Sequence, residues 1–169
     1  RRRRDAVDES GGQVRRLLNL VVMLGAAGLW AGVAARAQDS RPAMTVGSAT
    51  AARGQVAYGE LAVPPGTDAA ATIPVAVVHG ARPGKVVAFV AGAHGTEYAS
   101  SVALSRFIAR VTPSTLTGTV IVLPLLNVAS FEQMTVHINP IDRKGMNAGY
   151  PGLKDGTQTE RALALVTAQ

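Results

Sequence analysis

The chain has 169 residues, with 17 Lys and Arg, 11 Asp and Glu, and no cysteine. This length suits one domain of ordinary size, and the hydrophobic content of 47% excludes a disordered chain. The lack of cysteine excludes disulfides, thiolate metal ligands and a cysteine nucleophile. The net charge of +6 does not indicate a nucleic-acid-binding protein, because residues 1–37 carry +4 of it and aromatic residues make up only 4%.

Residues 1–37 have the features of an N-terminal extension followed by an export signal peptide. An Arg-Arg pair at 15–16 precedes an apolar stretch over 17–35, and the sequence ARA at 35–37 is of the kind that signal peptidase cleaves. We therefore expect a periplasmic or secreted protein that begins at or near Gln38 and meets a membrane only through this segment. A retained membrane anchor is the alternative, since the stretch nearly reaches the span of roughly 20 apolar residues that a bilayer requires.

Residues 38–54 contain Pro, Ser and Thr and are predicted to be a linker, and 55–169 are predicted to be a folded α/β domain. Apolar and alternating runs predict strands over 55–63, 72–78, 85–91 and 118–126, and helical spacing predicts helices over 98–111 and 157–168. The run KVVAFVA at 85–91 is typical of a strand buried on both faces. Because a helix separates them, 85–91 and 118–126 are predicted to be neighbouring parallel strands, and 127–156 is predicted to be a long loop.

The motif with the clearest chemistry is GAHGTE at 92–97, which lies between a predicted strand and the following helix. Ligands of α/β proteins bind at the carboxyl ends of strands, and a spacing of three residues lets His94 and Glu97 approach one point. Imidazole and carboxylate together suit Zn²⁺ without any thiolate, and the flanking glycines allow a tight turn. The alternative is a surface histidine beside a glutamate that complements the helix dipole.

Residues 85–131, which include VAFVAGAHGTEYASSVALSRFIAR and GTVIVLPLLNVASF, resemble the start of the succinylglutamate desuccinylase/aspartoacylase family of the zinc carboxypeptidase superfamily. The segment PIDRKGMNAGYPG at 140–152 is similar to the family loop P-x-D-G-K-(D/N)-L-N-R-x-F-P-G. The resemblance implies a three-layer α/β/α zinc-carboxypeptidase-like mixed sheet. It also implies that 55–169 is the truncated N-terminal portion of a zinc metallohydrolase domain.

The same resemblance implies the site and the reaction. His94 and Glu97 would be two Zn²⁺ ligands, and Asn147 would contact a substrate carboxylate or amide. Asp142 would either shape the loop or support a site residue without touching the metal itself. The family's third ligand, a histidine, and its general-base glutamate are expected beyond Gln169. The implied activity is zinc-dependent hydrolysis of an amide bond in an N-acyl amino acid or at a C-terminal peptide bond, acting on a small-molecule or peptide substrate.

One departure from the family loop bears on function. Ala148 stands where the family has an arginine, whose guanidinium would form two hydrogen bonds with a carboxylate. The absence of this arginine argues against a simple α-carboxylate substrate. Arg143 in the same loop is the candidate replacement for substrate binding, and a solvated loop charge is its alternative. A catalytically inactive fragment or binding module with the same fold is the alternative function.

The other nucleophiles and histidines carry weaker signals. No serine lies in a G-x-S-x-G sequence, so a serine hydrolase has no support. His79 and His137 are each expected to be ordinary surface or loop histidines. Of the two, His137 is the better candidate for a further metal ligand, because it lies in the loop expected to border the site.

Overall fold

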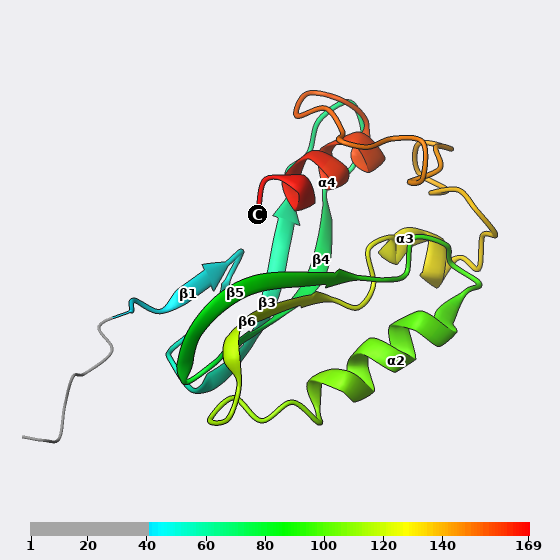
Figure 1. The fold of residues 1–169 in the computed structure, drawn as a ribbon. Coiled ribbons are helices and arrows are strands. Elements are labelled where there is room, and N and C mark those ends of the chain that lie inside the picture. The colour runs from blue at the N-terminus through cyan, green and yellow to red at the C-terminus, as the bar shows by residue number, and fades with distance from the viewer. Residues whose placement is uncertain (1–40) are drawn as a thin grey trace, which may run out of the picture. The chain divides into compact units, whose positions relative to one another are not determined.

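The computed structural model describes residues 41–169, and the predicted extension and export signal over 1–37 lie outside the described residues. Its strands are β1 (Met44–Val46), β2 (Ala49–Ala51), β3 (Gln55–Val63), β4 (Ala71–His79), β5 (Arg82–Val90) and β6 (Thr117–Leu123), and its helices are α2 (Tyr98–Ile108), α3 (Val128–Glu132) and α4 (Gln158–Thr167) (Figure 1). Within this range no helix combines the length and hydrophobicity needed to cross a membrane.

The main sheet is mixed and has the strand order β3-β4-β6-β5. β3 and β6 both run antiparallel to β4, whereas β5 runs parallel to β6, with Val87 opposite Val120. The chain passes from β5 to β6 through α2, which is the crossover that parallel neighbours require. The prediction that 85–91 and 118–126 form neighbouring parallel strands is therefore confirmed.

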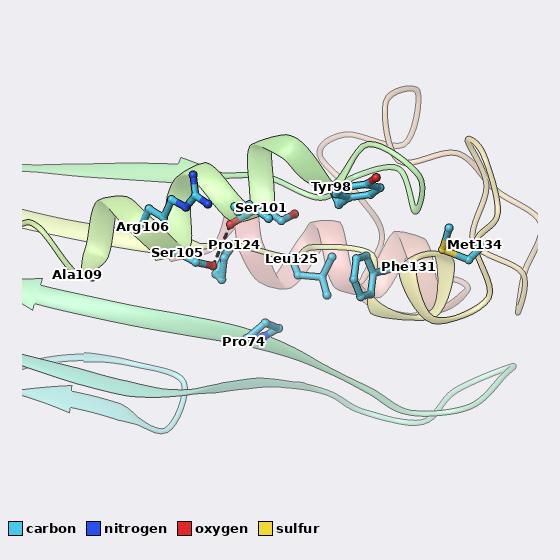
Figure 2. Close-up of a pocket in the computed structure, with 11 residues that line it drawn as sticks. Pro74, Tyr98, Ser101, Ser105, Arg106, Ala109, Pro124, Leu125, Phe131 and Met134 are labelled. Atoms are coloured by element: carbon cyan, nitrogen blue, oxygen red, sulfur yellow. Dashed lines mark hydrogen bonds between the residues drawn. The ribbon is translucent and has the colours of Figure 1, made fainter.

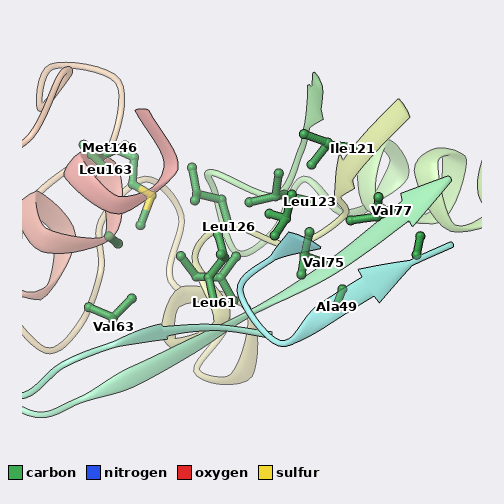
Figure 3. Packing of buried hydrophobic residues seen from close by; sticks show 14 residues of the cluster. Ala49, Leu61, Val63, Val75, Val77, Ile121, Leu123, Leu126, Met146 and Leu163 are labelled. Atoms are coloured by element: carbon green, nitrogen blue, oxygen red, sulfur yellow. The ribbon is translucent and has the colours of Figure 1, made fainter. Parts of the chain in front are cut away.

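The two faces of the sheet bury different side chains, as the two-residue period of a strand requires. One face packs against α4 and the β1–β2 hairpin, and Figure 3 shows this cluster, which includes Val75, Val77, Ile121, Leu123 and Leu163. The other face packs against α2 through Ala76, Val78, Val120, Val122 and Ile108. The sheet thus lies between two helical layers, which confirms the predicted three-layer α/β/α arrangement.

Part of the segment predicted to be a linker is instead part of the fold. Residues 44–51 form the β1–β2 hairpin, which turns at Gly47 with a φ of +58°. Val46 and Ala49 are buried in the core, and the Ser48 amide donates to the Glu60 carbonyl at 3.0 Å. Three-residue strands are too short to show a hydrophobic period, so the composition of this segment suggested a loop.

The prediction that 85–91 is buried on both faces is wrong for the described structure. Every residue of β5 is exposed, and Val86 and Phe89 as whole residues are 53% and 41% exposed. Among the described strands β5 lies at the end of the sheet and pairs with β6 alone. An apolar run shows that a strand suits burial, but burial itself depends on neighbours on both sides.

The predicted loop over 127–156 begins with a short helix, α3. Asn127 precedes it and accepts a hydrogen bond from the Ser130 amide through its side chain, as an N-cap does. Further on, Thr157 and Glu160 form a reciprocal capping box at the start of α4. The remainder of the loop is irregular and connects these two caps.

Candidate metal centre

The turn that carries His94 follows directly from the end of β5 and depends on glycine. Gly92 has a φ of +71°, and a Cβ there would collide with Leu125. A Cβ on Gly95 would collide with the backbone carbonyl of Ser130. The turn therefore packs closely against the residues after β6, and only glycine fits at these two positions.

A second contact holds the same turn from the α3 side. The Asn127 side chain is buried, and its Nδ2 donates to the carbonyl of Ala93 at 3.2 Å. The Asn127 backbone amide also donates to the carbonyl of Gly92 at 2.9 Å. The backbone before His94 is thus fixed to the N-terminal end of α3, which limits where the imidazole can point.

The predicted pair of metal ligands meets as expected. His94 Nδ1 lies 2.9 Å from Glu97 Oε2, and Glu97 is the residue immediately before α2. The two side chains therefore project to one point, and their role as metal ligands stays a prediction.

His137 approaches the same pair from the long loop. Its Nε2 lies 3.9 Å from Glu97 Oε1, and its ring centroid lies 4.8 Å from that of His94. One donor atom from each of the three residues lies within 4.8 Å of the other two. Sequence reasoning expected His137 to be an ordinary loop histidine, and its position in the loop was the only signal for this contact.

The donor set fits a zinc ion. Two imidazoles and one carboxylate are the nitrogen and oxygen ligands that Zn²⁺ accepts, and two ligand atoms on a tetrahedral zinc ion lie about 3.4 Å apart. The separation of 2.9 Å between His94 and Glu97 and that of 3.9 Å between His137 and Glu97 bracket this value. The side chain of His94 is only 15% exposed, whereas those of Glu97 and His137 are 62% and 66% exposed. The group is therefore open to solvent on one side.

The two candidate substrate residues, Asn147 and Arg143, are exposed. Neither side chain makes a hydrogen bond or ion pair with another described residue. Arg143 has a φ of +60°, so the loop turns sharply at this point. Their roles in substrate binding remain predictions.

Asp142 shapes the loop, as the resemblance implied. Its carboxylate accepts hydrogen bonds from the Thr159 amide at 2.8 Å and from the Lys144 amide at 3.0 Å. Burial acts to raise the pKa of Asp142, but these and further hydrogen bonds from Thr159 and Thr157 outweigh it and hold the pKa below its ordinary value. Asp142 thus ties the loop to the first turn of α4 as a carboxylate.

A neighbouring ion pair holds the same loop at its surface. Lys144 Nζ lies 2.8 Å from Glu160 Oε1. The hydrogen bond from Lys144, followed by that from the Thr157 amide, lowers the pKa of Glu160 to about 2. The charges of this loop are therefore used to hold the loop against α4.

His79 differs from its expected surface position. It lies at the end of β4, is 5% exposed, and its Nδ1 is 2.7 Å from the hydroxyl of Thr119 on β6. The strand pairing places His79 directly opposite Thr119. His79 is therefore part of the sheet and does not belong to the metal-donor group.

A separate pocket of about 840 Å³ lies between α2 and the ends of β4 and β6 (Figure 2). Its walls are mostly apolar and include Pro74, Tyr98, Val102, Leu125 and Phe131. None of His94, Glu97 and His137 lines it. The pocket is therefore not the metal-donor site, although Tyr98 directly follows Glu97 in sequence.

Comparison with known proteins gives the family. The family described as the succinylglutamate desuccinylase/aspartoacylase catalytic domain matches residues 83–169. A curated relative, the N-alpha-acetyl-L-2,4-diaminobutyric acid deacetylase of Halomonas elongata, is 31% identical over 110 residues, which are 63% of this chain and 32% of the relative. The chain thus spans about a third of the length of that relative.

Solved structures agree on the fold. An aspartoacylase family protein from Mesorhizobium loti is similar with a TM-score of 0.61 and 25% identity, over 76% of this chain and 40% of its own. The ectoine utilization protein EutE from Ruegeria pomeroyi, solved with product bound, is similar with a TM-score of 0.59 and 28% identity, over 74% of this chain and 35% of its own. With the match over 83–169, the chain belongs to the succinylglutamate desuccinylase/aspartoacylase catalytic domain family.

Proposed function

We propose that the protein is a zinc-dependent amide hydrolase that removes the acyl group from an N-acyl amino acid. The observation that carries this proposal is the meeting of His94 Nδ1 and Glu97 Oε2 at 2.9 Å, at the carboxyl end of a strand, in a chain of this family. The substrate class comes from the relative that is named as a deacetylase of an acetylated diamino acid. A carboxypeptidase-like activity has no such named relative among these comparisons and ranks second.

The residues of this chain have distinct roles in the proposal. His94 and Glu97 would hold the ion on the glycine turn, and a bound zinc would supply Lewis acidity toward the amide carbonyl. Asn147 holds the charged or amide end of the substrate, with Arg143 as the cation of the same loop. The general base that takes the proton from water is a glutamate expected beyond Gln169.

The test uses the full-length protein, which includes the expected general base. It compares zinc-loaded and metal-free protein with N-acetyl-2,4-diaminobutyrate, and the release of acetate is followed by NMR. We expect hydrolysis only with zinc, and loss of hydrolysis in His94→Ala. Glu132→Gln is the matched control, because Glu132 is an exposed carboxylate at the end of α3. Equal hydrolysis by metal-free and zinc-loaded protein would exclude the proposed chemistry.

A second substrate isolates the role of Ala148. Because the arginine expected after Asn147 is absent, the free carboxylate of the substrate has one fewer cation to bind. We expect the carboxamide of the same acetylated amino acid to be hydrolysed at a similar rate. A strong preference for the free acid would instead indicate that Arg143 or another cation binds the carboxylate.

Ala148 also favours a candidate of another class, a binding module without catalysis. In that case zinc and the acetylated amino acid would both bind, calorimetry would show one site for each, and acetate would not be released. Binding of zinc and of the acetylated amino acid without release of acetate would thus support the binding module and exclude the hydrolase.

Export is a separate part of the proposal and rests on residues 1–37 alone. We expect the native host to release a product that begins at or near Gln38 outside the cytoplasm. N-terminal sequencing of the protein from the periplasmic and medium fractions tests this. An uncleaved product in the cytoplasm would contradict it.

A further inference from the structure

We infer that Ser130 is a positioning residue of the proposed zinc site and holds the turn over 92–97 so that His94 and Glu97 reach one point. The inference rests on the proposed function, because it concerns the same site. Ser130 lies on α3, outside the GAHGTE motif, and it acts through the backbone of the turn without touching the ion or the substrate.

The first observation is that the two peptide groups next to His94 are both hydrogen-bonded to α3 or its N-cap. On one side, Asn127 Nδ2 donates to the Ala93 carbonyl at 3.2 Å. On the other side, the Gly95 amide donates to Ser130 Oγ at 3.0 Å in a buried position. Because a residue has only two soft backbone dihedrals, fixing both flanking peptide groups limits the direction in which the His94 imidazole leaves the turn.

The second observation is that Ser130 is itself held in place by its backbone. Ser130 is fully buried, with 0% of its surface exposed. Its amide donates to Asn127 Oδ1 at 3.2 Å, which joins the two residues that hold the turn. Its carbonyl accepts from the Thr135 amide at 3.0 Å. Ser130 is therefore a fixed support for the Gly95 amide.

The third observation is the direction of the Ser130 hydroxyl. The Thr135 hydroxyl lies 2.6 Å from the Ile138 carbonyl and donates to it. Because that hydroxyl has one proton, the contact of 2.7 Å between Ser130 and Thr135 is a donation from Ser130. The Ser130 oxygen thus keeps a lone pair for the Gly95 amide. Without this oxygen the buried amide has no acceptor, which is the unfavourable state for a buried donor.

The turn also packs too closely against α3 to shift without affecting the site. A Cβ on Gly95 would collide with the Ser130 carbonyl, so backbone lies directly against backbone. His94 Nδ1 and Glu97 Oε2 are 2.9 Å apart at the other side of the turn. A turn that moves away from α3 changes this separation, and zinc holds such ligand atoms at bond lengths of only about 2.0–2.2 Å.

The main test measures the zinc affinity of the full-length protein by competition with a chromophoric chelator. We expect Ser130→Ala to bind zinc about 10–100-fold more weakly, which is the cost typical of removing a residue that supports a metal ligand. Ser105→Ala is the matched control, because Ser105 is exposed on α2 and its hydroxyl donates to the Ser101 carbonyl of the same helix. The control should bind zinc as the unchanged protein does.

A second pair of variants separates the hydrogen bond from packing. Ser130→Thr and Ser130→Val add the same branched shape to the buried position and differ in the hydroxyl. We expect the threonine variant to bind zinc about 10-fold more tightly than the valine variant, or more. Circular dichroism and urea denaturation show which variants are folded, so that a loss of fold is not taken for a loss of affinity.

Two further readouts distinguish positioning from structural support. The visible absorption of bound Co²⁺ depends on the arrangement of its ligands, so at saturating Co²⁺ we expect a changed spectrum in Ser130→Ala and an unchanged one in Ser105→Ala. In the metal-free protein, the NMR signals of the His94 imidazole nitrogens should shift in Ser130→Ala, because the contact with Glu97 changes. A merely structural Ser130 would lower the urea midpoint and leave both readouts unchanged.

The outcomes separate this inference from the proposed function. If the unchanged full-length protein binds no zinc, the proposed zinc site and this inference both fail. If it binds zinc, and folded Ser130→Ala has the same affinity and the same Co²⁺ spectrum, the proposed function stands and Ser130 is not a positioning residue. Fast hydrogen exchange of the Gly95 amide in the unchanged protein would also overturn the inference, and this measurement needs no variant to fold.

Discussion

Two polar clusters of this chain use similar side chains for opposite purposes. One, which we call the helix anchor, consists of Asp68, Asp142, Gln158 and Arg161 and ties α4 to the β3–β4 connection and to the long loop. The other is the metal-donor group of His94, Glu97 and His137. In the anchor the donors and acceptors satisfy one another, whereas the metal-donor group leaves its nitrogen and oxygen atoms facing a shared space.

Arg161 shows how complete the anchor is. It is 4% exposed, and each guanidinium nitrogen donates: Nε to the Pro64 carbonyl at 3.0 Å, Nη1 to the Gly156 carbonyl, and Nη2 to Asp68 Oδ1 at 2.7 Å. A buried charge is tolerated when it is paired and hydrogen-bonded in this way. No such saturation exists in the metal-donor group, where two of three side chains are more than half exposed. A polar cluster whose donors and acceptors are all paired with one another supports the fold. A polar cluster whose donors and acceptors are not all paired can still bind a ligand.

The largest expected effect on folding is in the anchor. Arg161→Ala removes the buried guanidinium that pairs with Asp68 Oδ1 and donates to the Pro64 and Gly156 carbonyls, so we expect the free energy of unfolding to fall by about 3–5 kcal/mol. Urea denaturation followed by circular dichroism measures this. Lys154→Ala is the control, because Lys154 is exposed, and it should change stability by less than about 0.5 kcal/mol. An equally small change in Arg161→Ala would show that the anchor does not stabilise the fold.

A smaller loss is expected at the other end of the anchor. Asp142→Ala removes the acceptor of the Thr159 and Lys144 amides, and each partner left without an acceptor costs about 1–3 kcal/mol where it is buried. We expect a decrease of about that size in the unfolding free energy, with Asp155→Ala, an exposed carboxylate of the same loop, as control. If both variants have the same denaturation midpoint, Asp142 does not hold the loop.

The pH dependence of stability tests the ion pair of Lys144 and Glu160, which lies beside the helix anchor. The pKa of Glu160 is lowered from 4.5 to about 2 by Lys144 and the Thr157 amide, so the folded state favours the ionised form. Its contribution is complete above pH 4.5 and is lost as the pH falls toward 2. We expect the urea midpoint to fall across this window, and to fall less in Glu160→Gln. An unchanged slope in that variant would mean that other carboxylates cause the acid sensitivity.

The smallest expected effect on folding is in the metal-donor group. Glu97→Gln alters an exposed side chain, so without metal its unfolding free energy should stay within about 0.5 kcal/mol of the unchanged chain. Zinc at 100 times its dissociation constant should stabilise the unchanged chain by about 2.7 kcal/mol, and the variant much less. Thermal unfolding with zinc and with a chelator measures both. A variant that unfolds easily without metal would show that this group also supports the fold.

Local sequence patterns predicted the structure correctly where the contacts of a residue come from its own segment. The strand over 55–63 and the last helix agree with β3 and α4, and the glycines of the GAHGTE turn are needed where the motif places them. Patterns failed where the surroundings come from elsewhere. The β1–β2 hairpin is too short to show a period, and the apolar composition of β5 did not reveal that it lies at the edge of the described sheet.

The residues of the candidate site likewise divide into those that a local sequence pattern brings together and those that only tertiary packing brings together. His94 and Glu97 are three residues apart in one turn, so local geometry alone brings their side chains together, and the sequence by itself determined that pair. His137 is distant in sequence, and only the packing of α3 against the Gly92–Gly95 turn decides its position. The physical reason is that buried hydroxyls such as Ser130 must find partners. Here those partners, Gly95 and Thr135, belong to the two segments that carry the histidines.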